Sequence, residues 1–133
     1  MKYLIDTQIL IWFQLSSDKL SKKSIDLLLD VSNEILVSQV TLFELAIKQK
    51  IGKLPELDVP IEQVIALIRK DNFKVLNIHD KHISAYSQIP LLSDHRDPFD
   101  RLILATAFSE NISIISADEK FRAYESIIQL LAN

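Results

Sequence analysis

The most informative stretch of the sequence is residues 95–108, His-Arg-Asp-Pro-Phe-Asp-Arg-Leu-Ile-Leu-Ala-Thr-Ala-Phe. Pro98 suits the first position of a helix, because the N–H that proline lacks would be unpaired there. Asp97 is therefore the expected N-cap, and Asp100 falls in the first turn. A helix this apolar on all sides is normally buried, so Asp100 is carried to the edge of the core. A carboxylate there needs partners, and we expect further carboxylates with metal ions between them.

The bulk composition is that of an ordinary globular protein. The 133 residues are 48% hydrophobic and 25% charged, which suits one domain, residues 1–133, with a substantial core. The absence of cysteine excludes disulfides and thiolate metal sites. Three histidines are too few for a zinc site, whereas 18 Asp and Glu leave room for cations that prefer oxygen ligands. A net charge of −3 argues against nucleic-acid binding through bulk positive charge.

Targeting signals are not evident. No segment approaches the ~20 apolar residues that a membrane span requires. The first residues show no signal-peptide pattern, so we expect a cytoplasmic protein with no membrane partner.

Strand and helix patterns alternate along the chain. Short apolar runs predict strands at residues 2–5, 34–38, 73–78, 112–116 and 126–130. Helical periodicity and capping residues predict helices at residues 9–15, 22–31, 40–50, 61–70, 79–88 and 98–111. This alternation is typical of an α/β fold in which helices cover both faces of a parallel sheet. Such sheets bind ligands beyond the carboxyl ends of the strands, where the strand order reverses.

Acidic residues converge on that edge of the predicted sheet. Asp6 ends the first strand, Asp118 follows the fourth strand, and Glu44 lies about two turns into the helix after the second strand. Together with Asp100, these carboxylates would repel one another and raise their pKa values unless a cation lies among them. Mg²⁺ or Mn²⁺ is the natural candidate, because both are hard ions that take oxygen ligands.

Each acid also has a purely structural interpretation. For Asp97 we prefer the role of helix cap, which the helix dipole favours. Asp6 and Asp118, taken singly, could be loop or cap residues. Glu44 could pair with Lys48 one turn later, a contact worth only about 0.2–0.5 kcal/mol. The convergence of the acids, rather than any one of them, favours a metal site.

At these residues the sequence resembles the PIN-domain nucleases, specifically the VapC-like toxins of bacterial toxin–antitoxin pairs. The matching stretches occur in family order at residues 4–7, 38–54, 95–101 and 116–118. The resemblance implies a three-layer fold with a five-stranded parallel sheet, and RNA cleavage that depends on Mg²⁺ or Mn²⁺. It assigns catalysis and metal binding to four residues, Asp6, Glu44, Asp100 and Asp118.

The sequence departs from the family pattern at two places. Gln8 stands where many relatives have histidine, and Ser93-Asp94 lengthens the loop before His95. Neither change touches the four acids, so both bear on substrate preference more than on activity.

Hydroxyl groups stand beside the acids. Thr7, Ser38 and Ser116 could hold water molecules or orient the carboxylates. Ending a strand is at least as good an explanation for these residues.

Several basic residues accompany the motifs. Arg96, Arg101 and Lys48 could meet RNA phosphates, although a salt bridge to a neighbouring acid is an equal alternative for Arg101. His95 is better explained by capping or packing than by a role as general base.

Two other functions remain open. A phosphoacceptor receiver module also has acids beyond its strand ends, but it needs a lysine after the fifth strand, and residues 129–133 contain none. A catalytically silent PIN-like module that only binds a partner would bind no divalent metal, and the intact acids favour retained chemistry.

Residues 42–70 predict two amphipathic helices joined by a proline-bracketed loop. A groove between them could accept a partner helix, and the resemblance identifies that partner as an antitoxin. The equal alternative is that both apolar stripes cover the sheet. The expected partners are thus an RNA substrate, an antitoxin and a second copy in a homodimer.

Overall fold

The structure is a computed structural model that describes residues 1–92 and 97–133. Within these residues a five-stranded parallel sheet has the order β3-β2-β1-β4-β5. Its strands are β1 (Lys2–Ile5), β2 (Glu34–Ser38), β3 (Lys74–Leu76), β4 (Ser113–Ser116) and β5 (Leu130–Ala132). The helices are α1 (Thr7–Gln14), α2 (Lys22–Leu29), α3 (Gln39–Lys50), α4 (Ile61–Lys70), α5 (Asp80–Tyr86), α6 (Pro98–Glu110) and the 3₁₀ helix η1 (Glu119–Tyr124). The predicted α/β fold is confirmed.

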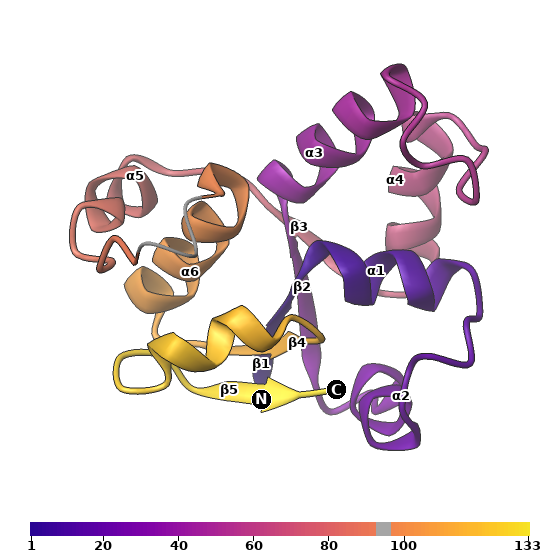
Figure 1. The fold of residues 1–133 in the computed structure, drawn as a ribbon. Coiled ribbons are helices and arrows are strands. Elements are labelled where there is room, and N and C mark those ends of the chain that lie inside the picture. Colours follow the sequence, from indigo (N-terminus) through magenta and orange to yellow (C-terminus); the bar gives the residue numbers. More distant parts are fainter. Residues whose placement is uncertain (93–96) are drawn as a thin grey trace.

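Helices cover both faces of the sheet, as its apolar strands require. Figure 1 shows α5 and α6 on one side and α1, α2 and α4 on the other. Successive residues of β1 alternate between the two resulting cores: Ile5 packs with the α1 side, and Leu4 packs with the α6 side. Because both faces of the sheet are covered at β1 and β2, these two strands are almost unbroken apolar runs.

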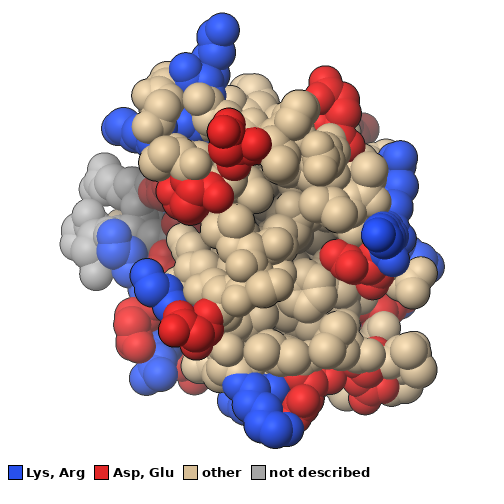
Figure 2. Space-filling view, turned by 90° about the vertical axis from the view of Figure 1, so that its right-hand side faces the viewer, with Lys and Arg blue, Asp and Glu red and all other residues tan. Residues whose placement is uncertain are grey.

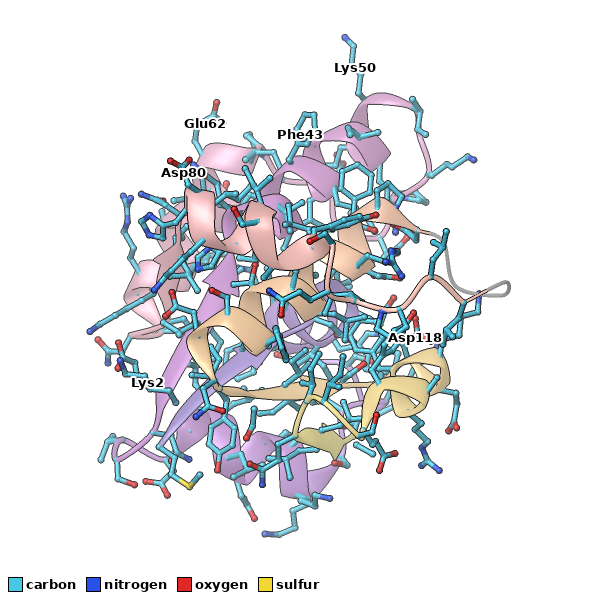
Figure 3. The ribbon with its side chains drawn as sticks, turned by 90° about the vertical axis from the view of Figure 1, so that its left-hand side faces the viewer. Lys2, Phe43, Lys50, Glu62, Asp80 and Asp118 are labelled. Carbon is cyan, nitrogen blue, oxygen red and sulfur yellow. The ribbon has the colours of Figure 1, made fainter. Side chains whose placement is uncertain are left out.

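The strand order reverses between β1 and β4, and this reversal locates the expected ligand site. The chain runs outward from β1 through β2 to β3, and then returns to the other side of β1 with β4. Figure 3 shows Lys2, at the start of β1, and Asp118, just after β4, at opposite ends of the sheet. Asp118 therefore marks the carboxyl edge, where ligands of such sheets bind.

Helix α6 begins and ends as its sequence predicts. Asp97 is the N-cap and accepts hydrogen bonds from the N–H groups of Phe99 and Asp100, with Pro98 at the start of the helix. Asn111 ends the helix in the left-handed conformation with a φ of 54°. None of the helices in residues 1–92 and 97–133 is long and apolar enough to cross a membrane.

The last strand lies later in the chain than predicted. The expected strand at residues 126–130 is wrong, because the N–H groups of Ile127 and Ile128 both bond to the carbonyl of Tyr124 in a turn that follows η1. Pairing with β4 begins only at Leu130, opposite Ile114. The apolar run extends across both segments, so periodicity alone does not fix its register.

Helices α5 and α6 meet through a partly buried polar contact, which we call the α5–α6 contact (Lys81, His82 and Glu110). His82 is fully buried, and its Nδ1 accepts a hydrogen bond of 3.0 Å from the backbone N–H of His79. Nε2 therefore carries the proton and donates to Glu110 Oε1 at 2.8 Å. Lys81 Nζ lies 3.1 Å from the same oxygen.

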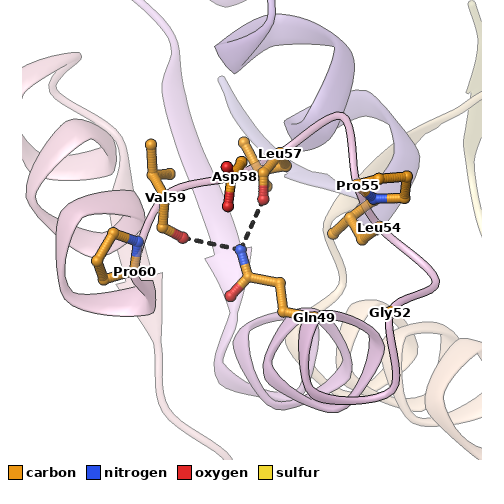
Figure 4. A pocket seen from close by; sticks show the side chains of 8 residues that line it. All are labelled: Gln49, Gly52, Leu54, Pro55, Leu57, Asp58, Val59 and Pro60. Atoms are coloured by element: carbon orange, nitrogen blue, oxygen red, sulfur yellow. Dashed lines mark hydrogen bonds between the residues drawn. The ribbon is translucent and has the colours of Figure 1, made fainter.

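The loop between α3 and α4 is fixed by one side chain. Gln49 Nε2 donates to the carbonyls of Leu57 at 2.9 Å and Val59 at 2.8 Å, beside a cavity of about 360 Å³ (Figure 4). In α4, Val64 and Ile68 are fully buried in the core. The apolar stripe of α4 thus faces the interior. This agrees with the alternative in which the stripe covers the sheet instead of forming a groove for a partner helix.

Candidate active site

Four acids from four elements lie at the carboxyl edge of the sheet, and we call them the acid edge: Asp6, Glu44, Asp100 and Asp118. They follow β1 and β4 directly or lie on α3 and α6. The structure places all four predicted acids in this region, since each of the others raises the pKa of Asp100.

Asp6 and Asp118 are linked through the hydroxyl of Ser116. Ser116 Oγ donates to Asp6 Oδ2 and accepts the backbone N–H of Asp118 at 2.9 Å. Asp6 also caps α1 by accepting the N–H of Ile9 at 2.9 Å, and Asp118 caps η1 through the N–H of Lys120 at 2.9 Å. Burial raises the pKa of Asp6, and its hydrogen bond from Ser116 opposes this rise. Asp6 and Asp118 thus act as helix caps, and the same carboxylates remain candidates for binding a metal ion.

Glu44 is buried on α3 and held at both oxygens. Thr7 donates to Oε1 at 2.7 Å, and Lys48 Nζ lies 3.0 Å from Oε2. The predicted pairing of Glu44 with Lys48 is confirmed. The hydroxyl of Thr41, one turn before Glu44, lies 3.1 Å from that of Thr7. Thr41 is completely buried and was not predicted to belong to the site, although its helical spacing from Glu44 was a signal for it.

Asp100 also has a strongly raised pKa. Burial is the largest cause, followed by repulsion from Asp97, Glu44, Asp118 and Asp6, and together they raise its pKa to about 7. A carboxylate with this pKa is only partly ionised at neutral pH, and a cation nearby would reverse the shift. Strongly perturbed acids in a region of like charge are typical of functional sites.

The acid edge has the chemistry of a magnesium site but not a closed ligand cage. Its donors are carboxylate oxygens, which hard cations prefer. Among the described residues, however, no three carboxylate or histidine side chains lie close enough together to form a ligand group as they stand. Mg²⁺ commonly keeps several waters and binds through one or two carboxylates, so this open arrangement fits such an ion.

Arg101 has a different role from both that were expected. Its guanidinium is buried and donates to the carbonyls of Ile89 and Pro90, each at 2.7 Å, and to the hydroxyl of Tyr86 at 3.1 Å. It is therefore not exposed to RNA phosphates, and within the described part of the chain it pairs with no acid. Arg101 instead ties the start of α6 to the segment after α5.

The remaining predicted residues divide into two groups. Ser38 is buried and caps α3 by accepting the N–H of Val40 at 3.1 Å. The predictions for Ser93-Asp94, His95 and Arg96 lie outside the described residues.

Comparison with known proteins gives one family and a consistent set of folds. The family model for the PIN domain matches residues 3–126. A chain of VapBC2 from Rickettsia felis, bound to a DNA fragment of its promoter, matches with 17% identity and a TM-score of 0.71, over 99% of this chain and 98% of that one. VapBC-1 from nontypeable Haemophilus influenzae gives 22% identity and a TM-score of 0.67, over 99% and 98%.

A third solved structure is VapBC-5 from Mycobacterium tuberculosis, a member of the VapBC family of toxin-antitoxin systems. It matches with 18% identity and a TM-score of 0.59, over 98% of this chain and 96% of that one. No curated protein matches the chain in sequence. At these identities the solved structures show a shared fold.

Proposed function

The chain belongs to the PIN domain family, whose members are nucleases, and from this premise we propose that it is an endoribonuclease dependent on Mg²⁺ or Mn²⁺. The observation that carries the proposal is the gathering of four acids at the carboxyl edge of the sheet, where burial and then repulsion between carboxylates raise the pKa of Asp100 to about 7. Such an arrangement costs stability without a cation, and a bound metal ion offsets that cost. RNA cleavage also suits the cytoplasmic location expected from the sequence.

The acid edge would hold the metal, with Asp6, Asp100 and Asp118 as ligands, directly or through water, and Glu44 completing the cluster. When bound, Mg²⁺ or Mn²⁺ lowers the pKa of water and stabilises the charge that develops on a phosphodiester.

The neighbours of these acids keep them in place. Ser116 fixes Asp6 relative to the backbone of Asp118, and Thr7 holds Glu44 against α1. Asp97 caps α6 and so positions Asp100 in its first turn.

Cleavage of defined RNAs with and without a chelator tests the proposal. We expect cleavage with Mg²⁺ or Mn²⁺ and none with chelator. Asp100→Asn should lower the rate by a factor on the order of 100 or more, as loss of a preorganised charge does elsewhere. Asp80→Asn is the matched control, because Asp80 occupies the first turn of α5 and lies away from Asp118 in Figure 3. Equal cleavage by wild type and Asp100→Asn would refute the site assignment.

The alternative function is a catalytically silent PIN-like module that binds a partner. Calorimetry separates the two, since the silent module binds neither Mg²⁺ nor Mn²⁺. The intact acid edge favours the nuclease.

An antitoxin is the protein partner that we propose. Several structural neighbours are VapBC toxin-antitoxin complexes. Figure 2 shows a broad face with few charged side chains, on the side of the molecule where Figure 1 places α1, α2 and α4. A cavity of about 450 Å³ lies there, with an apolar lining that includes Phe13, Leu20 and Leu29. Leu29 is 62% exposed.

A pull-down with the tagged chain from its native host, followed by titration with any small co-encoded protein that it recovers, tests the antitoxin proposal. Leu29→Lys should weaken that binding, because it places a charge in the apolar cavity. Ile83→Lys, at an exposed apolar residue of α5 on the opposite side, is the control and should leave binding intact. The proposal fails if neither wild type nor control binds, or if both variants bind equally well.

We also propose a homodimer, formed through the outer face of α3. Phe43 is 61% exposed there, and Ile51, the C-cap residue that follows α3, is 56% exposed. Phe43 makes an edge-to-face contact with Phe99 of α6. Light scattering should give a dimeric mass for wild type and a monomeric mass for Phe43→Lys. Val31→Lys, at another exposed apolar residue, should remain dimeric.

A further inference from the structure

A small cavity adjoins the acid edge on the side of β4 and β5. It has a volume of about 130 Å³, and Ser116 and Asp118 form part of its wall. Trp12 of α1, and Glu119 and Arg122 of η1, also line it. Residues from both ends of the sequence thus place an aromatic ring and a cation next to two groups of the acid edge.

Trp12 is held in place but only partly covered. Its ring packs against the core on the α1 side and keeps some solvent exposure. Within the described part of the chain, no hydrogen-bond partner of the indole N–H is found. A ring that is fixed on one side and open on the other is suited to stacking with a planar ligand.

Arg122 supplies a charge that a ligand can recruit. Its side chain is 58% exposed, and its Nε lies 3.4 Å from Glu119 Oε2 in an exposed ion pair. Exposed pairs of this kind contribute little stability, so an anion can displace Glu119 at small cost. The guanidinium group matches phosphate well because it can donate two parallel hydrogen bonds.

We propose that this cavity is the subsite for the nucleotide next to the cleaved phosphodiester, with its base stacked on Trp12 and its phosphate paired with Arg122. The inference rests on the proposed ribonuclease function, and it adds a path for the RNA chain from the acid edge into this cavity. An acidic edge in a chain with a net charge of −3 repels RNA. Proteins that bind single-stranded nucleic acid combine cations along the backbone with aromatic rings on which bases stack, and this cavity offers one of each.

Fluorescence offers a direct test, because Trp12 is the only tryptophan of the chain. The probe is a single-stranded RNA of mixed sequence, about 12 nucleotides long, within the usual length range of such sites. It is added to the full-length Asp100→Asn variant in Mg²⁺, so that binding is measured without cleavage. Anisotropy of a labelled RNA reports binding, and Trp12 emission with unlabelled RNA reports the cavity. We expect Trp12 emission to change along the same saturation curve as the anisotropy.

Further variants in the same background separate stacking from charge. Trp12→Leu should weaken RNA binding about tenfold, whereas Trp12→Phe, which keeps an aromatic ring, should stay within about threefold of the parent. Arg122→Gln should weaken binding about tenfold and lower the salt dependence by about one counterion. Arg69→Gln, at an exposed arginine of α4, is the matched control and should change neither quantity.

The outcomes distinguish the subsite from the function on which it rests. RNA binding with unchanged Trp12 emission, or with full affinity in Trp12→Leu and Arg122→Gln, would overturn the subsite and leave the ribonuclease proposal standing. Failure of the parent to bind RNA, together with failure of wild type to cleave it, would overturn both. Emission that responds to the neighbouring small protein but not to RNA would assign the cavity to a protein partner instead.

Discussion

Helix α6 carries an acid near each end, and the two have opposite surroundings. Glu110 at the carboxyl end bonds to His82 and pairs with Lys81, and these contacts hold its pKa below the usual value. At the amino end, burial and then repulsion from four other carboxylates raise the pKa of Asp100 to about 7. The basic groups of the α5–α6 contact lower the pKa of its acid, whereas burial and neighbouring carboxylates raise the pKa of Asp100. A strongly raised pKa among like charges is typical of functional sites, whereas the lowered pKa of Glu110 accompanies contacts that join two helices.

The largest change in stability that we expect comes from Arg101, which, like the α5–α6 contact, joins the region of α5 to α6. Arg101→Met should lower the free energy of unfolding by about 4 kcal/mol, because the acceptors at Ile89, Pro90 and Tyr86 lose the charged donor that the buried guanidinium supplies. Urea denaturation measures this loss. Arg69→Met, at an exposed position, should change stability by less than about 0.5 kcal/mol. A loss equally small for Arg101→Met would show that the guanidinium is not structural.

At the acid edge, by contrast, removing a charge should stabilise the fold. In the folded chain the raised pKa keeps Asp100 protonated up to pH of about 7, whereas the unfolded chain releases that proton near pH 4. Stability therefore falls as the pH rises from about 4 to about 7. With a chelator at pH 8, Asp100→Asn should raise the free energy of unfolding by about 2 kcal/mol, less than the full linkage value because the carboxyl is partly exposed.

Denaturation of Asp100→Asn and wild type across this pH range measures the effect. The advantage of the variant should shrink below pH of about 7 and vanish near pH 4. Asp80→Asn should show no such profile. A variant that is less stable than wild type at pH 8 would contradict the view that the acid edge is electrostatically strained.

Glu110→Gln tests the other end of α6 and should destabilise the chain by about 1 kcal/mol at pH 7, since a charged acceptor of His82 and Lys81 is lost. The lowered pKa of Glu110 determines how its contribution to stability changes with pH. Its contribution is complete above the unfolded pKa of about 4.3 and disappears as the pH falls through the lower folded value. Thermal denaturation at pH 7 and near pH 3 should show the difference between variant and wild type closing. A constant difference would mean that packing, not charge, accounts for it.

The smallest expected effect comes from the metal itself. Mg²⁺ at about three times its dissociation constant should stabilise wild type by about 0.8 kcal/mol. The shift in melting temperature should be smaller for Asp100→Asn and unchanged for Glu110→Gln at equal pH. Equal shifts in all three proteins would place the ion elsewhere.

The local parts of this comparison were readable from the sequence, and the long-range parts were not. Asp97 and Pro98 dictate where α6 begins, and Asn111 where it ends, since each acts through its own backbone neighbours. Arg101, by contrast, bonds to the carbonyls of Ile89 and Pro90, which lie in a separate segment before α6. No spacing within residues 95–108 could therefore indicate its burial.

The last strand illustrates the same limit. Its position depends on which apolar residues pair with β4, and Leu130 rather than Ile127 or Ile128 begins that pairing. For the site, the positions of Asp6 and Asp118 followed from strand ends, whereas Thr41 and the cavity beside Trp12 required the packed structure.

The bond between Ser116 and Asp6 joins residues 110 positions apart, and this separation bears on how the protein is made. Ribosomes add about 5–20 residues per second, so Asp6 leaves the ribosome several seconds before its partner exists. Until β4 has docked beside β1, a growing chain holds the acids but no assembled site. The ribonuclease activity proposed above therefore requires a chain whose β4 has already been made and has paired with β1.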